Sequence, residues 1–106
     1  MARAVAPTLG PMLVERRLRR VSRRLVTLRE ELQVADEQLL HFAEMSDDTR
    51  IRSLVSETPQ ADQDHREAER TTTAMQRHRA DLRTQIDRLE AEQDELLDRL
   101  AERRRG

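Results

Sequence analysis

Apolar residues recur at alternating intervals of four and three positions along two long stretches of this chain. Such intervals keep returning to one side of an α-helix, whereas a half-buried strand requires strict alternation. Sustained over several heptads, the pattern is typical of a coiled coil, and we call these positions the seam. In the first stretch the seam consists of Val14, Leu18, Val21, Leu25, Leu28, Leu32, Ala35, Leu39 and Phe42. In the second stretch it consists of Ala61, His65, Ala68, Thr72, Met75, Arg79, Leu82, Ile86, Leu89, Gln93, Leu96 and Leu100.

Helix-start signals divide the chain, because proline suits the first turn of a helix and Ser, Thr or Asp caps it. They lie at Gly10-Pro11, Ser46-Asp47-Asp48 and Thr58-Pro59. We expect a flexible N-terminal arm over residues 1–10, followed by a single domain over 11–105. The predicted helices of that domain are 11–45, a short tip helix at 47–56, and 59–103. The predicted fold class is therefore all-α, a long coiled-coil helical hairpin with a short tip helix.

Composition excludes several classes of protein. Among the 106 residues, Phe42 is the single aromatic, so a wide core built on aromatic side chains is not expected. The absence of cysteine excludes disulfides and Cys-ligated metals, and no apolar run approaches the roughly 20 residues that span a bilayer. We expect a cytoplasmic protein with no cofactor, no metal and no membrane partner. All 20 cations are arginine, which indicates a bacterial source with a GC-rich genome.

The charge distribution predicts that the two long helices run antiparallel. Residues 1–29 are rich in arginine, and a cluster of acidic residues lies between Glu90 and Asp98. An antiparallel register with Leu25 opposite Leu89 sets Arg16–Arg24 beside that cluster and pairs the apolar seam residues well. The alternative register, with Val14 opposite Gln93, pairs the apolar residues less completely. Each exposed ion pair contributes roughly 0.2–0.5 kcal/mol, so the charges select the register more than they stabilise it.

Apolar residues that fall off the seam indicate a second contact surface. The predicted partner face consists of Val26, Val34 and Leu40, all on the first long helix. A hairpin of this size is marginally stable alone, and a second apolar stripe is best explained by another chain. We expect a homodimer in a four-helix arrangement, or binding to another helical protein. Scattered apolar surface residues are the alternative interpretation.

The arginine run Arg16–Arg24 is the one feature that suggests phosphate contacts. It lacks aromatic residues for base stacking and Asn or Gln for base edges, and its acidic complement lies in the same chain. Nucleic acid is therefore not an expected partner. The same residues fit a charge zipper, either within one chain or between chains.

Two His–carboxylate pairs have a spacing that occurs in metal sites. Glu37 and His41 are spaced four residues apart, as are His65 and Glu69, which suits two ligands on one helix face. The heptad positions direct Glu37 and His41 away from the seam, whereas His65 lies on it. The pairs therefore do not converge within one hairpin, and a metal site is not expected.

Three segments resemble, in order, the motifs of the small all-helical chorismate mutases: Leu28-Arg29-Glu30-Glu31, Asp36-Glu37-Gln38-Leu39-Leu40 and Asp64-His65-Arg66-Glu67-Ala68. The resemblance implies an intertwined helical dimer with an Arg-rich site for a dicarboxylate, to which Arg29, Arg66 and Glu67 would contribute. A second family arginine falls near Glu44 or Met45, and the family's lysine has no counterpart. Because no nucleophile–base pair is recognisable either, we do not expect an enzyme.

The predicted tip carries Asp47 and Asp48. Coiled-coil hairpins with acidic tips resemble the secondary-channel regulators of bacterial RNA polymerase, in which tip carboxylates reach a catalytic Mg²⁺. Those families carry an additional globular domain, which this chain lacks. The simpler interpretation is that both aspartates stabilise a helix start. We therefore expect a non-catalytic protein–protein interaction module, an adaptor, scaffold or regulator that acts as a homo-oligomer. The alternative is a transcription-associated regulator that binds RNA polymerase or a sigma-type partner through the hairpin and its acidic tip.

Overall fold

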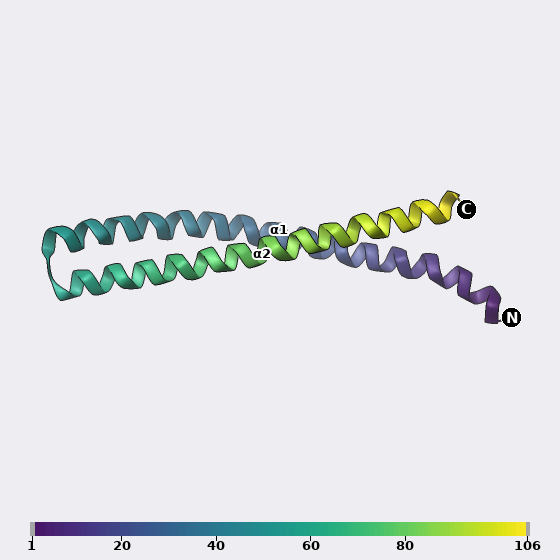
Figure 1. Ribbon diagram of the computed structural model, residues 1–106, viewed down its shortest axis with the longest axis horizontal. Helices are drawn as coiled ribbons and strands as arrows, with labels where there is room; N and C mark the ends of the chain where they lie inside the picture. Colours follow the sequence, from purple (N-terminus) through teal and green to yellow (C-terminus); the bar gives the residue numbers. More distant parts are fainter. Residues whose placement is uncertain (1, 106) are drawn as a thin grey trace. The chain divides into compact units, whose positions relative to one another are not determined.

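The chain folds as an all-α helical hairpin of two long helices (Figure 1). The computed structural model describes the backbone of residues 2–105 and the side chains of residues 12–105. Helix α1 comprises Ala2–Ser56 and helix α2 comprises Pro59–Arg105. Within the described residues there is no β-strand. The predicted fold class is thus confirmed, with differences at the helix boundaries that are given below.

The hairpin divides into two compact units, each made from a stretch of α1 and a stretch of α2. The first, which we call the terminal unit, consists of Met1–Arg29 and Thr84–Gly106. The second, which we call the turn unit, consists of Glu30–Arg83 and contains the connection between the helices. Because the heptad spacing continues in both, each unit buries the seam side of its helix stretches.

The terminal unit has an apolar seam. Leu25 and Leu28 are fully buried, and the other buried residues are Val14, Val21, Ile86 and Leu96. Gln93 donates a hydrogen bond to Ser22 Oγ at 3.1 Å across the two helices. This pairing agrees with the register that sets Leu25 opposite Leu89, and it contradicts the alternative in which Gln93 lies opposite Val14. The predicted charge contact is present as well, because Arg17 Nη2 lies 3.1 Å from Glu92 Oε1.

The turn unit has a seam that becomes polar toward the connection. Ala35 and Leu82 are buried, and Leu32, Leu39, Phe42 and Met75 are half-buried. Beyond Phe42 the half-buried positions of α1 are Ala43, Ser46, Thr49 and Ser53, opposite a stretch of α2 in which the half-buried residues are Ala61, His65, Ala68 and Thr72. The Thr72 hydroxyl lies 3.2 Å from the Phe42 carbonyl oxygen, and Thr49 Oγ1 lies 3.4 Å from His65 Nδ1. These pairs continue the register seen in the terminal unit.

The separate tip helix is a correction to the sequence-based prediction. Residues 47–56 are helical, but they continue α1 without a break at Ser46-Asp47-Asp48. Ser and Asp cost only about 0.5 kcal/mol each relative to Ala in a helix interior, and no Gly or Pro interrupts this stretch. Since the intervals of four and three pass through Ser46, Thr49 and Ser53, packing holds the helix in phase to its end.

The start of α1 differs from the prediction, whereas the start of α2 agrees with it. The backbone of 2–10, expected to be a flexible arm, belongs to α1. The side chains of residues 1–11 lie outside the described residues. The start of α2 at Pro59 is confirmed, and Thr58 caps it, because the Ala61 N–H donates to Thr58 Oγ1 at 3.2 Å. Glu57, between the helices, has a φ of 49°, which is the left-handed region.

Candidate interaction surfaces

The polar side chains inside the hairpin are hydrogen-bonded in the part that the structure describes. No buried side-chain nitrogen or oxygen among the described residues lacks a hydrogen-bond partner, and no group of three or more His, Asp or Glu converges there. His65 Nε2 lies 3.0 Å from Glu69, and His41 packs its ring at 5.8 Å from Phe42. The predicted seam residues of α1 from Val14 to Phe42 are buried or half-buried between the two helices.

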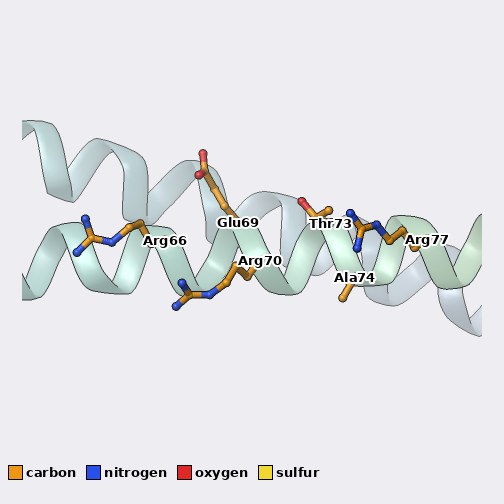
Figure 2. Close-up of a pocket in the computed structure, with 6 residues that line it drawn as sticks. All are labelled: Arg66, Glu69, Arg70, Thr73, Ala74 and Arg77. Atoms are coloured by element: carbon orange, nitrogen blue, oxygen red, sulfur yellow. The ribbon is translucent and has the colours of Figure 1, made fainter.

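The three residues matched to the chorismate mutase motifs belong to different units of the hairpin. Arg29 belongs to the terminal unit, where its Nη2 lies 3.4 Å from Glu90 Oε1. Arg66 and Glu67 are exposed on α2 in the turn unit. Arg66 instead lies beside Glu69, Arg70, Thr73, Ala74 and Arg77, and together these line a shallow groove (Figure 2).

That groove lies along a single helix. All six lining side chains come from successive turns of α2, with Arg66, Arg70 and Arg77 as its cations. The arginine guanidinium groups make no ion pair with a described residue. Because three of the lining residues are arginine and only Glu69 is acidic, the groove has a net positive charge. It has no buried polar anchor that would fix a small ligand.

The side of α1 that faces away from α2 has a different character in the turn unit. We call this side the acidic face. Here Val34, Leu40, Ile51, Leu54 and Val55 are exposed, and Leu40, Leu54 and Val55 reach 64%, 69% and 79% exposure. Between them lie acidic side chains with no ion pair to any described residue: Glu30, Glu37, Glu44, Asp47 and Asp48.

The same side of α1 in the terminal unit is basic. We call it the basic face. Exposed apolar residues are again present, namely Met12, Leu13 and Val26. The charged residues are Arg16, Arg19, Arg20 and Arg23, and none of them pairs with a described carboxylate, since only Arg17 of the run reaches Glu92. The predicted charge zipper is therefore formed only in small part within one chain.

Sequence reasoning identified part of these faces. Val26, Val34 and Leu40 were predicted to form a partner face, and all three are exposed on the side of α1 away from α2. Ile51, Leu54 and Val55 are not part of that predicted face. The seam intervals continuing through Ser46 and Thr49 contain the signal that was missed, because they place that trio on the outer side.

The predicted tip residues lie on the acidic face. Asp47 and Asp48 are exposed in the interior of α1, and their carboxylates accept no hydrogen bond from a described residue. They do not cap a helix start, because α1 has none at this point. A small groove of about 320 Å³ lies nearby between α1 and α2, lined on one side by Phe42, Met45 and Thr49, and on the other by Asp64, Glu67, Ala68 and Thr71.

Comparison with protein-family models, with curated proteins and with solved structures gives no significant match to this chain. The class of protein is thus defined by its fold, a two-helix antiparallel coiled coil, and by its charged surfaces. None of the described helices is apolar over a length that would cross a bilayer.

Proposed function

We propose that this protein is a non-catalytic coiled-coil interaction module that works as a homo-oligomer and binds helices through the outer side of α1. The observation that supports the proposal is the exposure of Val34, Leu40 and Leu54 on a helix side that α2 does not cover. An adaptor, scaffold or regulator of this kind needs an exposed amphipathic helix rather than a pocket. The structure has such a helix side, and its described interior has no metal cluster.

The energetic scale of this association is modest. Burying these side chains between two chains removes a few hundred Å² of apolar surface, which stabilises by several kcal/mol at roughly 25 cal/mol per Å². Loss of translational freedom and ordering of side chains oppose this gain. We therefore expect a dimer that dissociates on dilution rather than an irreversible one.

Sedimentation equilibrium tests the proposal. The unaltered chain is expected to be dimeric at about tens of micromolar, and Val34→Glu or Leu40→Glu is expected to shift it toward monomer with its helicity intact. Leu97→Glu is a matched control, because Leu97 is an exposed leucine on α2 whose exposure of 48% is close to the 51% of Val34. A fully helical monomer at those concentrations would contradict self-association. A Leu97→Glu variant that dissociates as much as the others would contradict the placement of the contact on α1.

A second candidate function is a transcription-associated regulator that binds RNA polymerase or a sigma-type partner through the acidic end of the hairpin. The observation in its favour is that Asp47 and Asp48 are exposed without an intrachain partner or a capping role. Affinity purification from native lysate would test it by comparing the unaltered chain with Asp47→Asn/Asp48→Asn. Recovery of polymerase subunits by the former and not the latter would support this function, and recovery of neither would exclude it.

A further inference from the structure

The outer side of α1 is built from pairs of exposed residues that recur every seven positions. Each pair comes directly after a seam position, and every second seam position is followed by such a pair. At about 100° per residue, these two positions turn away from the seam to the outer side of the helix. Every member is exposed. We call them the outer pairs: Met12-Leu13, Arg19-Arg20, Val26-Thr27, Gln33-Val34, Leu40-His41, Asp47-Asp48 and Leu54-Val55.

From either end of α1, the outer pairs follow the same order of apolar and charged residues. The charged pair is basic near one end and acidic near the other. The first and last pairs are apolar. The second is Arg19-Arg20, and the second from the other end is Asp47-Asp48. The third pairs inward each contribute one large apolar residue, Val26 and Leu40, and Gln33-Val34 is the middle pair.

We infer that the basic face of one chain binds the acidic face of a second copy, with the two α1 helices antiparallel and Arg19-Arg20 opposite Asp47-Asp48 of the other copy. This inference rests on the proposed self-association and specifies its partner surface and its register. The pairing needs one face from each copy. Because both copies carry both faces, it occurs twice, and Gln33-Val34 lies opposite the same pair of the second chain.

Charge complementarity selects this register over its neighbours. A shift by one heptad in one direction sets Arg19-Arg20 against Leu40-His41 and the apolar Met12-Leu13 against Asp47-Asp48. A shift in the other direction sets Arg19-Arg20 against Leu54-Val55. Parallel pairing in register sets the arginine pair against itself, and like charges placed opposite one another disfavour a complex. Only the proposed register pairs opposite charges and apolar residues together.

The absence of partners within the chain supports an intermolecular role for these charges. No ion pair joins any described residue to Arg19, Arg20, Asp47 or Asp48. The nearby Arg17, by contrast, forms an ion pair with Glu92 on α2. Other residues of the outer side lie between the pairs along α1. In the proposed register, Arg23 lies opposite Glu44 of the second copy, which is a further pair of opposite charges. The same register brings Glu30 near Glu37, a repulsive contact at the centre.

Charge reversal in two separate variants tests the register. Arg19→Asp/Arg20→Asp and Asp47→Arg/Asp48→Arg are each expected to raise the dimer dissociation constant about tenfold or more, because each then opposes like charges. An equimolar mixture of the two is expected to restore a dimer, since every reversed pair meets an opposite charge in the other variant. Arg66→Asp/Arg70→Asp, which makes the same charge change on α2, is the control and is expected to leave association unchanged.

Engineered cysteines report the orientation, because the chain has no native cysteine. Val34→Cys is expected to form a disulfide-linked dimer under mild oxidation, because Val34 lies opposite the Gln33-Val34 pair of the second chain. Val26→Cys is not expected to form one, because the antiparallel register keeps the two Val26 residues of the dimer apart. Crosslinking of both variants would indicate parallel helices and overturn the inference. It would also be overturned if neither crosslinked, or if mixing the charge-reversed variants restored nothing. A dimer that fails these tests leaves the proposed function standing, whereas a monomeric unaltered chain contradicts both.

Discussion

The two units of the hairpin use the same heptad spacing with opposite chemistry on the seam. In the terminal unit the seam is mostly leucine, valine and isoleucine, with Leu25 and Leu28 fully buried. In the turn unit, beyond Phe42, it consists of Ser46, Thr49 and Ser53 on α1, facing small or polar residues of α2. Cross-helix contacts there are hydrogen bonds, such as Thr49–His65 at 3.4 Å and Ser53 with Asp62.

The two units therefore contribute differently to the hairpin. One mainly supplies its stability, and the other mainly sets the register of the two helices. A buried aliphatic side chain contributes about 1.5–3 kcal/mol by leaving water, whereas an intramolecular hydrogen bond contributes only about 0.5–1.5 kcal/mol net. The terminal unit therefore holds the helices together, and the polar pairs of the turn unit fix which residues lie opposite one another. Beyond Phe42 the turn unit also exposes large apolar residues on α1, namely Met45, Ile51, Leu54 and Val55.

The largest expected effect is on the terminal unit. Leu25→Ala should lower the free energy of unfolding by about 2–4 kcal/mol, because a fully buried leucine leaves a cavity. Thr49→Ala, at a seam position in the turn unit, should cost no more than about 1 kcal/mol, since it removes half-buried hydrogen bonds to His65 and to the Ser46 carbonyl oxygen but no large apolar side chain. Urea denaturation followed by circular dichroism measures both. Equal losses would remove the proposed difference between the units.

Hydrogen exchange should show the same difference without mutation. Amides of α1 near Thr49 and of α2 near His65 should open with a free energy roughly 1–2 kcal/mol lower than amides near Leu25 and Leu96, because few apolar contacts close the turn unit. Measurement by NMR at several concentrations separates opening within a chain from dissociation of a dimer. Uniform protection along both helices would show that the hairpin opens as one cooperative element.

A smaller, stabilising effect is expected at the connection. Glu57 adopts φ 49°, a conformation that costs a non-glycine residue about 1–2 kcal/mol, while glycine loses about 0.5–1 kcal/mol more chain entropy on folding. Glu57→Gly should therefore raise the free energy of unfolding by about 0.5–1 kcal/mol. Thermal denaturation against Glu57→Ala, which keeps the left-handed penalty, provides the comparison. A variant with glycine no more stable than the alanine variant would contradict this account.

The smallest effect is expected at the former tip. Asp47→Asn/Asp48→Asn should change the free energy of unfolding by less than about 0.5 kcal/mol, because both side chains are exposed, unpaired and in the interior of α1. Thermal denaturation of this variant at low concentration, where the chain is monomeric, isolates the effect on the hairpin. A loss of a full kcal/mol would show that these residues stabilise a helix end after all.

The sequence was a strong guide where apolar periodicity was unbroken and a weaker one where local signals competed with packing. The seam from Val14 to Phe42 and the capped start of α2 at Thr58 are observed, because spacing and a Thr-Pro start act locally. The predicted helix break at Ser46 was wrong, because residues that can cap a helix do not end one that stays packed against its neighbour. The outer side of α1 was recognised at Val34 and missed at Leu54, for the same reason.

The unbroken seam also limits how this chain can change in length during evolution. Each residue advances a helix by about 100°, so deletion of a single residue near Thr49 would turn every later position of α1 away from α2. The outer pairs would rotate by the same angle, so one deletion would disturb both sides of the helix at once. Whole heptads preserve the phase, and antiparallel pairing requires that one be lost from each helix together. Relatives of this hairpin should therefore differ in length by matched multiples of seven placed symmetrically about the turn.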